Sequence, residues 1–195
     1  MSSGLRRFSC TYGGSCPSLG SGNGFLYSYT PTLTVTASAI AGITYGDAAP
    51  SLTGYSYALS GYLGSDSGSD HISGSIDGST TYTQGSDVGT YNINYSSGSL
   101  ASSMGYGFTY ANNASAFTVG QKTITASLTG TVSKTYDRTN TATLGSSNYS
   151  LSGVYGSDAV NISTTSGTYD DKNVGTGKTV SVTGMTLAGA KAGNY

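Results

Sequence analysis

The side chains that could carry acid–base or nucleophilic chemistry are few in this chain. His71 is the only histidine, and all nine acidic residues are aspartates. Ser69, Asp70 and His71 are adjacent in the sequence, but a catalytic triad is assembled from separate segments in space. Asp170 and Asp171 would point to opposite faces of a strand, and there is no glutamate to form a glycosidase pair. The sequence therefore predicts no catalytic residue and no enzyme.

One short segment has the composition of a cation-binding loop. Asp66-Ser67-Gly68-Ser69-Asp70 spaces oxygen ligands with small residues, as the calcium loops of secreted modules do. The later glutamate of an EF-hand is absent, and the same residue types form Asx turns. We interpret this segment as a plain turn, with calcium binding as the alternative. The sequence predicts no metal ligand and no cofactor.

The two cysteines lie close together in the sequence. Cys10 and Cys16 flank Gly13-Gly14, which lets the backbone reverse, so a small disulfide-closed loop is sterically reasonable. A structural zinc site needs four ligands, and the single histidine leaves too few. We therefore predict a disulfide between Cys10 and Cys16, and with it an oxidising compartment.

The charge and hydropathy of the chain argue against several partners. The formal net charge is −1, and no run of lysine or arginine provides the positive surface that phosphate groups require. Nucleic acid and anionic membranes are therefore not expected partners. No apolar run approaches the roughly 20 residues of a membrane span. No apolar stretch follows Arg6 and Arg7, so any export signal is expected to lie outside this sequence.

Alternation of apolar and polar residues is the main indication of secondary structure. Leu33, Val35 and Ala37 alternate with threonines, which is typical of a strand with one buried face. The same period of two recurs in other segments, namely 25–29, 91–95, 106–110 and 124–128. The abundance of tyrosine, threonine and glycine also favours strands and tight turns. The sequence predicts an all-β protein.

The chain repeats itself at a distance of about 90 residues. The phrase Leu59–Asp66, LSGYLGSD, returns as LSGVYGSD at Leu151–Asp158, an offset of 92. Thr34–Ser38 returns at an offset of 89, and three further matching residues follow in the same order at an offset of 86. A repeat of this length is too long for a solenoid and fits a small sandwich domain. We therefore predict tandem Ig-like β-sandwich domains joined end to end.

The repeat also sets the expected domain boundaries. Residues 1–32 have no counterpart and are predicted to form an N-terminal hairpin extension that carries the Cys10–Cys16 loop. The first domain is predicted to span residues 33–120 and the second residues 121–195. By alignment to the first domain, the second lacks its last strand, the counterpart of Ala116–Val119.

Several motifs resemble two known domain families. Ile43–Leu52, with Tyr-Gly-Asp followed by Pro and Leu, resembles the opening of MBG domains. Ser133–Thr139 resembles the opening of YDG domains, and Asp171–Lys178 and Ala192–Tyr195 are similar to later motifs of that family. Arg138 stands where that family has glycine. If that position requires a positive φ, arginine is strained there by about 1 kcal/mol.

The resemblance implies a function that the residues alone do not indicate. Both families occur as repeats in large, secreted Gram-negative surface proteins of the filamentous-haemagglutinin kind. The chain is therefore expected to be an extracellular stalk in a bacterial adhesin, with neighbouring repeats of the same parent chain as its partners. The alternative is a module that itself binds host glycans or matrix proteins. Exposed tyrosines such as Tyr55, Tyr57 and Tyr62 could stack on sugars, although a core role is favoured for them.

Overall fold

The computed structural model describes residues 5–8, 10, 24–64, 66, 71–96, 98–111 and 113–195. All regular elements of this part of the chain are β-strands, except for two 3₁₀ helices of three residues each. The prediction of an all-β protein is therefore confirmed, whereas the sandwich arrangement of the sheets stays a prediction. None of the described helices is long and apolar enough to cross a membrane.

The chain divides into two compact units, each built from several separate segments that alternate along the sequence. The first unit comprises residues 1–42, 48–83 and 90–118, and the second comprises residues 43–47, 84–89 and 119–195. The second unit therefore includes two segments from the region predicted to be the first domain. These segments contain the Tyr45-Gly46-Asp47 motif and residues 84–89.

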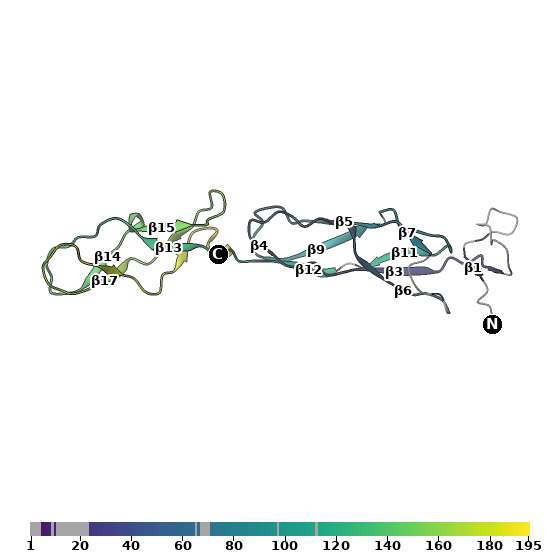
Figure 1. The fold of residues 1–195 in the computed structure, drawn as a ribbon, viewed down its shortest axis with the longest axis horizontal. Helices are drawn as coiled ribbons and strands as arrows, with labels where there is room; N and C mark the ends of the chain where they lie inside the picture. Colours follow the sequence, from purple (N-terminus) through teal and green to yellow (C-terminus); the bar gives the residue numbers. More distant parts are fainter. Residues whose placement is uncertain are drawn as a thin grey trace. The chain divides into compact units, whose positions relative to one another are not determined.

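The first unit contains short strands, several of which are labelled in Figure 1. They are β1 (Leu5–Arg7), β2 (Gly24–Leu26), β3 (Thr32–Ala37), β5 (Thr53–Tyr55), β6 (Tyr57–Ser60), β7 (Ile72–Ser73), β8 (Ile76–Thr80), β9 (Gly89–Ser96), β10 (Ala101–Ser102), β11 (Gly107–Ala111) and β12 (Asn113–Gly120). The first residue of β9 and the last two residues of β12 belong to the second unit.

The second unit contains the remaining strands and both 3₁₀ helices. The strands are β4 (Ile43–Thr44), β13 (Thr125–Leu128), β14 (Thr141–Thr143), β15 (Tyr149–Ser152), β16 (Asn161–Ile162), β17 (Ser166–Tyr169), β18 (Val180–Ser181) and β19 (Leu187–Ala188). The 3₁₀ helices are η1 (Ser146–Asn148) and η2 (Ala192–Asn194).

Two sheets contain most of the strands of the first unit, and one of them also includes β4 of the second unit. In one sheet, β3 lies between β11 and β6, parallel to β11 and antiparallel to β6. The other sheet has the order β4-β12-β9-β8-β5. Strand β12 thus lies between β4 and β9, and it runs parallel to β4 with Val119 opposite Ile43. Because β11 and β12 follow each other in the chain, residues 107–120 contribute a strand to each sheet.

The predicted alternation is confirmed by burial along β3. Leu33, Val35 and Ala37 are at most 5% exposed, whereas the threonines between them are exposed. Their inward faces pack against partly buried aromatic rings, including those of Tyr55 and Tyr57. The core interpretation of these two tyrosines is therefore the one that the structure supports.

The described part of residues 1–32 is not a hairpin, contrary to the sequence-based prediction. Strands β1 and β2 pair in parallel, with Leu5 opposite Gly24 and Arg7 opposite Leu26. A two-residue turn can join antiparallel strands only, because parallel strands need a crossover connection. Phe25 and Tyr29 were expected on one strand face with Tyr27, but β2 ends at Leu26 and both rings are more than 60% exposed.

The strand pairs of the second unit reproduce those of the first. Antiparallel β13 and β15 correspond to β3 and β6, and antiparallel β16 and β19 correspond to β7 and β10. The sheet β14-β17-β18 corresponds to β5-β8-β9. The described strands of the second unit include no counterpart of β11 or β12.

The register of these pairs corrects one of the predicted offsets. In the first unit Thr34 pairs with Ser60, and in the second Thr125 pairs with Ser152. Thr34 and Thr125 are 91 residues apart, whereas the matching phrases had suggested an offset of 89 for this strand. The error is two residues, which keeps every side chain on the same face of the strand. Short threonine-rich phrases match equally well after such a shift, so the sequence cannot distinguish the two registers.

Candidate functional site

The repeated phrase ends in an aspartate that binds a distant tyrosine. In the first unit, the Tyr106 hydroxyl donates a hydrogen bond to Asp66 Oδ2 at 2.7 Å and accepts one from the Leu63 N–H at 3.0 Å. Gly61, within the phrase, has a φ of 96°, a backbone conformation that residues with a Cβ rarely adopt. The phrase is therefore a shaped turn that presents Asp66 to Tyr106.

The second unit contains the same arrangement. The Tyr195 hydroxyl donates to Asp158 Oδ2 at 2.6 Å and accepts from the Tyr155 N–H at 2.9 Å. Gly153 has a φ of 88°, close to that of Gly61. We call each arrangement a tyrosine–aspartate clamp. The phrase occurs twice because it forms the same clamp in each domain.

A second tyrosine binds the clamp of the second unit. The Tyr45 hydroxyl donates to Asp158 Oδ2 at 2.8 Å, and its ring lies 5.6 Å from that of Tyr155 and 5.5 Å from that of Tyr195. Its backbone N–H donates to the carbonyl of Gly120 at 2.9 Å, which places it at the end of the β4–β12 pair. Tyr45 is only 1% exposed. The tyrosine of the Tyr-Gly-Asp motif is thus a core residue of the second unit.

A polar network lies beside Tyr45. Asp87 Oδ1 accepts hydrogen bonds from Lys191 Nζ at 2.5 Å and from Asn194 Nδ2 at 2.8 Å. The Asn194 side-chain oxygen accepts from the Val88 N–H at 3.0 Å. Lys191 and Asn194 hold the pKa of the Asp87 carboxyl below its usual range. Asn194 is 3% exposed, and these bonds offset the cost of burying its amide.

The tyrosines of the clamp in the second unit are neutral hydrogen-bond donors with a structural role. Burial, and secondarily the hydrogen bond to the Asp158 carboxylate, raise the pKa of the Tyr45 phenol from 10.0 to about 12. Burial likewise raises the pKa of Tyr195, with the bond to Asp158 as a further cause. Phenols held in the neutral state donate to the carboxylate and do not act as bases or nucleophiles at neutral pH.

The raised pKa predicts a specific loss of stability in alkali. The unfolded chain ionises Tyr45 near pH 10, whereas the folded chain keeps the phenol neutral until about pH 12. This contribution to stability is therefore complete below about pH 10 and is lost as the pH rises towards 12. Denaturant titrations of the wild type and of Tyr45→Phe at pH 7, 10 and 12 measure it. The difference in unfolding free energy between the two proteins should shrink above pH 10, and a constant difference would contradict the prediction.

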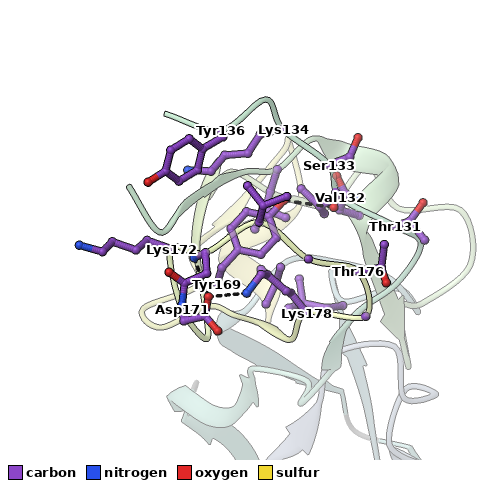
Figure 2. A pocket seen from close by; sticks show the side chains of 18 of the residues that line it. Thr131, Val132, Ser133, Lys134, Tyr136, Tyr169, Asp171, Lys172, Thr176 and Lys178 are labelled. Atoms are coloured by element: carbon purple, nitrogen blue, oxygen red, sulfur yellow. Dashed lines mark hydrogen bonds and ion pairs between the residues drawn. The ribbon is translucent and has the colours of Figure 1, made fainter. Parts of the chain in front are cut away.

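A cavity of about 540 Å³ opens elsewhere in the second unit. Residues 128–134 line one side and residues 171–178 the other, and the buried side chains of Leu144 and Tyr169 also contribute. The Tyr169 hydroxyl donates to the Val132 carbonyl at 3.1 Å. Figure 2 shows these side chains around the cavity.

Charged side chains lie along the cavity. Lys178 forms an ion pair with Asp171, drawn as a dashed line in Figure 2. This ion pair lowers the pKa of the Asp171 carboxyl. Lys134 Nζ lies 5.7 Å from the centroid of the Tyr169 ring and 2.8 Å from Asp137 Oδ1. Lys172 also lines the cavity. The wall therefore combines apolar surface with three lysines and one carboxylate.

The Tyr136-Asp137-Arg138 motif forms a turn at the rim of this cavity. Asp137 Oδ1 accepts from the Thr139 N–H and hydroxyl, both at 2.9 Å, and from Lys134 Nζ. Lys134, and then Thr139, lower the pKa of the Asp137 carboxyl to about 2. Arg138 has a φ of 68° and is the one described non-glycine residue with a positive φ. The position therefore does require the conformation that glycine adopts without strain.

Replacing Arg138 with glycine is expected to stabilise the second unit by about 1 kcal/mol, because the left-handed conformation costs a residue with a Cβ roughly that amount. Chemical denaturation measures the change. Arg138→Ala is the control, since it removes the charge and keeps the Cβ, and it should bring no gain. Equal stabilisation by both variants would show that charge, not backbone conformation, is the cause.

The residues predicted to form sites are placed as follows. Cys10 is buried, but Cys16 lies outside the described residues, so the disulfide stays a prediction. The candidate calcium loop is described only at Asp66, which belongs to the first clamp. His71 is exposed, and its carbonyl accepts from the Ser103 N–H. Among the described residues no group of three or more His, Cys or Asp side chains could hold a metal ion.

The clamp itself was not found by sequence reasoning. Tyr45 was noted as part of a family motif and Asp158 as the end of a repeated phrase, but nothing connected the two. They are 113 residues apart in the sequence. The repetition of Asp66 as Asp158, at an offset of 92, was the only available signal that these aspartates have a shared role.

The strand pairs and the clamps define this chain as a tandem all-β repeat protein. Family models match two adjoining parts of it, an MBG domain of the YGX type at residues 33–118 and a YDG domain at residues 120–195. The chain contains an MBG domain followed by a YDG domain, in the predicted order. Both kinds of domain are found in repeat-type surface proteins. No curated protein and no solved structure matches the chain.

Proposed function

We propose that this chain is a non-enzymatic stalk segment of a large adhesin, secreted to the surface of a Gram-negative bacterium. In this role its partners are neighbouring repeats of the same parent chain, and the tandem presents a distal binding region for cell adhesion. The observation that carries the proposal is the burial of Tyr45, a residue of the MBG match, against Tyr195 and Asp158 of the YDG match. Because all three residues belong to one compact unit, sequence from both family matches folds into a single body, which suits a load-bearing segment.

The chain path gives further support. The backbone passes between the two compact units at residues 42/43, 47/48, 83/84, 89/90 and 118/119. Five covalent crossings transmit a pulling force through several strands, whereas a single linker would carry it alone. Such connectivity suits a mechanical element.

The N-terminal residues suggest that the pattern extends beyond two domains. Phe8 lies 4.8 Å from the ring of Tyr106, much as Tyr45 lies 5.5 Å from that of Tyr195. Phe8 follows the parallel pair β1–β2, and Tyr45 follows the strand β4 of the parallel pair β4–β12. In each domain, therefore, the clamp tyrosine packs against an aromatic residue that follows a parallel strand pair. A regular array would repeat this contact.

Force spectroscopy on the 195-residue chain, held at its two ends, tests the stalk function. A stalk should give reproducible unfolding peaks, and the 76 residues of the YDG match should release roughly 260 Å of chain at about 3.4 Å per residue. Featureless extension at low force would overturn the proposal.

The alternative function is a module that itself binds host glycans or matrix proteins. One observation favours it, since the Tyr136 ring is 55% exposed beside the cavity and could stack on a sugar. Binding of labelled chain to glycan and matrix arrays separates the two functions. Saturable binding that Tyr136→Ala abolishes would establish the module, and its absence in a folded sample supports the stalk.

A further inference from the structure

We propose that the MBG match carries a recognition surface for the domain that follows it, a socket in which Gly46 and Gly85 hold the ring of Tyr155. The partner that fits this socket is a domain with an aromatic residue at the fifth position of the phrase LSGVYGSD, as the YDG domain of this chain has. The recognition of one repeat by the next rests on the proposed function. The socket itself rests on contacts within the second unit.

The two glycines lie on separate segments of the MBG match, and both segments belong to the second unit. Gly46 lies in the segment 43–47, and Gly85 lies in the segment 84–89. The side chain of Gln84 connects the two segments, because its Nε2 donates a hydrogen bond to the Gly46 carbonyl at 2.8 Å. This bond keeps the two glycines together.

The ring of Tyr155 lies so close to both glycines that a side chain at either position would crowd it. A Cβ at residue 46 would lie 2.7 Å from Cδ2 of Tyr155 and 3.0 Å from its Cγ, and a Cβ at residue 85 would lie 3.2 Å from its Cε1. Cδ2 and Cε1 are opposite atoms of the six-membered ring, so the two glycines contact opposite ends of it. The Tyr45 ring adds a third contact, edge-on, with its centroid 5.6 Å from that of Tyr155.

The clamp does not need a tyrosine side chain at this position of the phrase. In the second unit the Tyr155 N–H donates to the Tyr195 hydroxyl at 2.9 Å, and in the first unit the Leu63 N–H donates to the Tyr106 hydroxyl at 3.0 Å. Both bonds use the backbone, so the clamp forms with leucine as well as with tyrosine. The ring of Tyr155 therefore serves the contact with the glycines, and its identity distinguishes the two domains.

The two domains of this chain also differ at the socket positions. At the offset of 91 found for β13, Gly46 corresponds to Asp137. At the offset of 86 found for residues 88–90, Gly85 corresponds to Asp171. Each glycine of the socket is thus an aspartate in the second domain, while leucine replaces the tyrosine of the phrase in the first. The socket and the ring therefore fit in one order, with the MBG match first and the YDG domain after it.

Glycine suits both socket positions for two physical reasons, which the test has to separate. The φ angles of Gly46 and Gly85 are 89° and 88°, values that a residue with a Cβ adopts only with strain. The close approach of the ring is the second reason. Gly184 has only the first, since its φ is 65° and a Cβ there would meet nothing within 4 Å. It also lies in the second unit, so Gly184→Ala measures the strain without the crowding.

Hydrogen exchange of the β13 and β15 amides in the full chain measures the equilibrium constant for unfolding of the second unit. Gly46→Ala should raise this constant about thirtyfold more than Gly184→Ala does, because the Tyr155 ring cannot move aside without losing its packing against Tyr45. Gly85→Ala should have a smaller excess effect, since its Cβ would lie 3.2 Å from the ring and not 2.7 Å. The milder variant keeps the test decisive if Gly46→Ala does not fold.

Substitutions of the ring test the same contact from its other side. Tyr155→Ala removes every ring atom and keeps the backbone bond of the clamp, so in this background Gly46→Ala should cost no more than Gly184→Ala. Tyr155→Leu, which introduces the residue of the first domain, should raise the unfolding constant about tenfold or more. Tyr155→Phe is the matched control, since it keeps the ring, and it should change the constant by less than about threefold.

Two results would overturn the proposal. An equal cost of Gly46→Ala with and without the Tyr155 ring would leave backbone strain as the only reason for glycine. Equal unfolding constants for Tyr155→Leu and Tyr155→Phe would show that the socket does not discriminate between the residues of the two domains. Both results concern the stability of the second unit, so they are distinguishable from a failure of the stalk function, which force spectroscopy reports separately.

Discussion

Replacing Tyr45 with alanine is expected to destabilise the second unit by about 3–5 kcal/mol, which is the usual cost of truncating a fully buried aromatic side chain. The ring is 1% exposed and packs edge-on against both Tyr155 and Tyr195. The substitution removes these contacts and the hydrogen bond to Asp158, and it leaves a cavity in the middle of the clamp.

Equilibrium denaturation of the full chain measures this effect, with hydrogen exchange to assign the transition to residues 119–195. The matched control is Tyr136→Ala, because Tyr136 is the sequence counterpart of Tyr45 and is 55% exposed. Its loss should change the free energy of unfolding by no more than about 0.5 kcal/mol. Similar effects for the two variants would mean that the clamp does not stabilise the second unit.

Replacing Asp158 with alanine is expected to cost about 2–4 kcal/mol. A single carboxylate oxygen accepts from the hydroxyls of Tyr45 at 2.8 Å and Tyr195 at 2.6 Å. Removing it leaves two hydroxyls of the clamp without their acceptor, and each such group costs roughly 1–3 kcal/mol when it stays out of water. The effect should be confined to the second unit, because Asp158 and Tyr45 both belong to it.

Asp158→Asn is the control for shape, since the amide oxygen still accepts one hydrogen bond, and its cost should be clearly smaller. A double-mutant cycle with Tyr45→Phe isolates the pairwise term between the two side chains. A coupling energy within error of zero would show that the hydrogen bond seen between them contributes nothing to stability.

Local sequence patterns were sufficient to predict the strands and the tandem repeat. The alternation of Leu33, Val35 and Ala37 reports which face of β3 is buried, because side chains on a strand point alternately to its two sides. The tandem was visible because whole phrases recur, and the families because their turn motifs are local. The strain at Arg138 was predictable for the same reason, since a turn of three or four residues is specified by those residues alone.

The sequence alone did not show which individual tyrosines are buried and which are exposed. Tyr45 and Tyr136 both follow a threonine and both stand in the opening motif of their domain, yet one is buried and the other exposed. The difference depends on what packs against each ring, and for Tyr45 those partners are 110 to 150 residues away in the chain. No local pattern contains that information.

Tertiary structure alone decided the register of β13, the parallel pairing of β1 with β2, and the position of residues 43–47 within the second unit. Each of these features is a choice between arrangements that satisfy the same alternation and bury the same faces. The choice is made by contacts between distant segments, such as Tyr45 with Asp158, whose energy exists only once the chain has brought the two together.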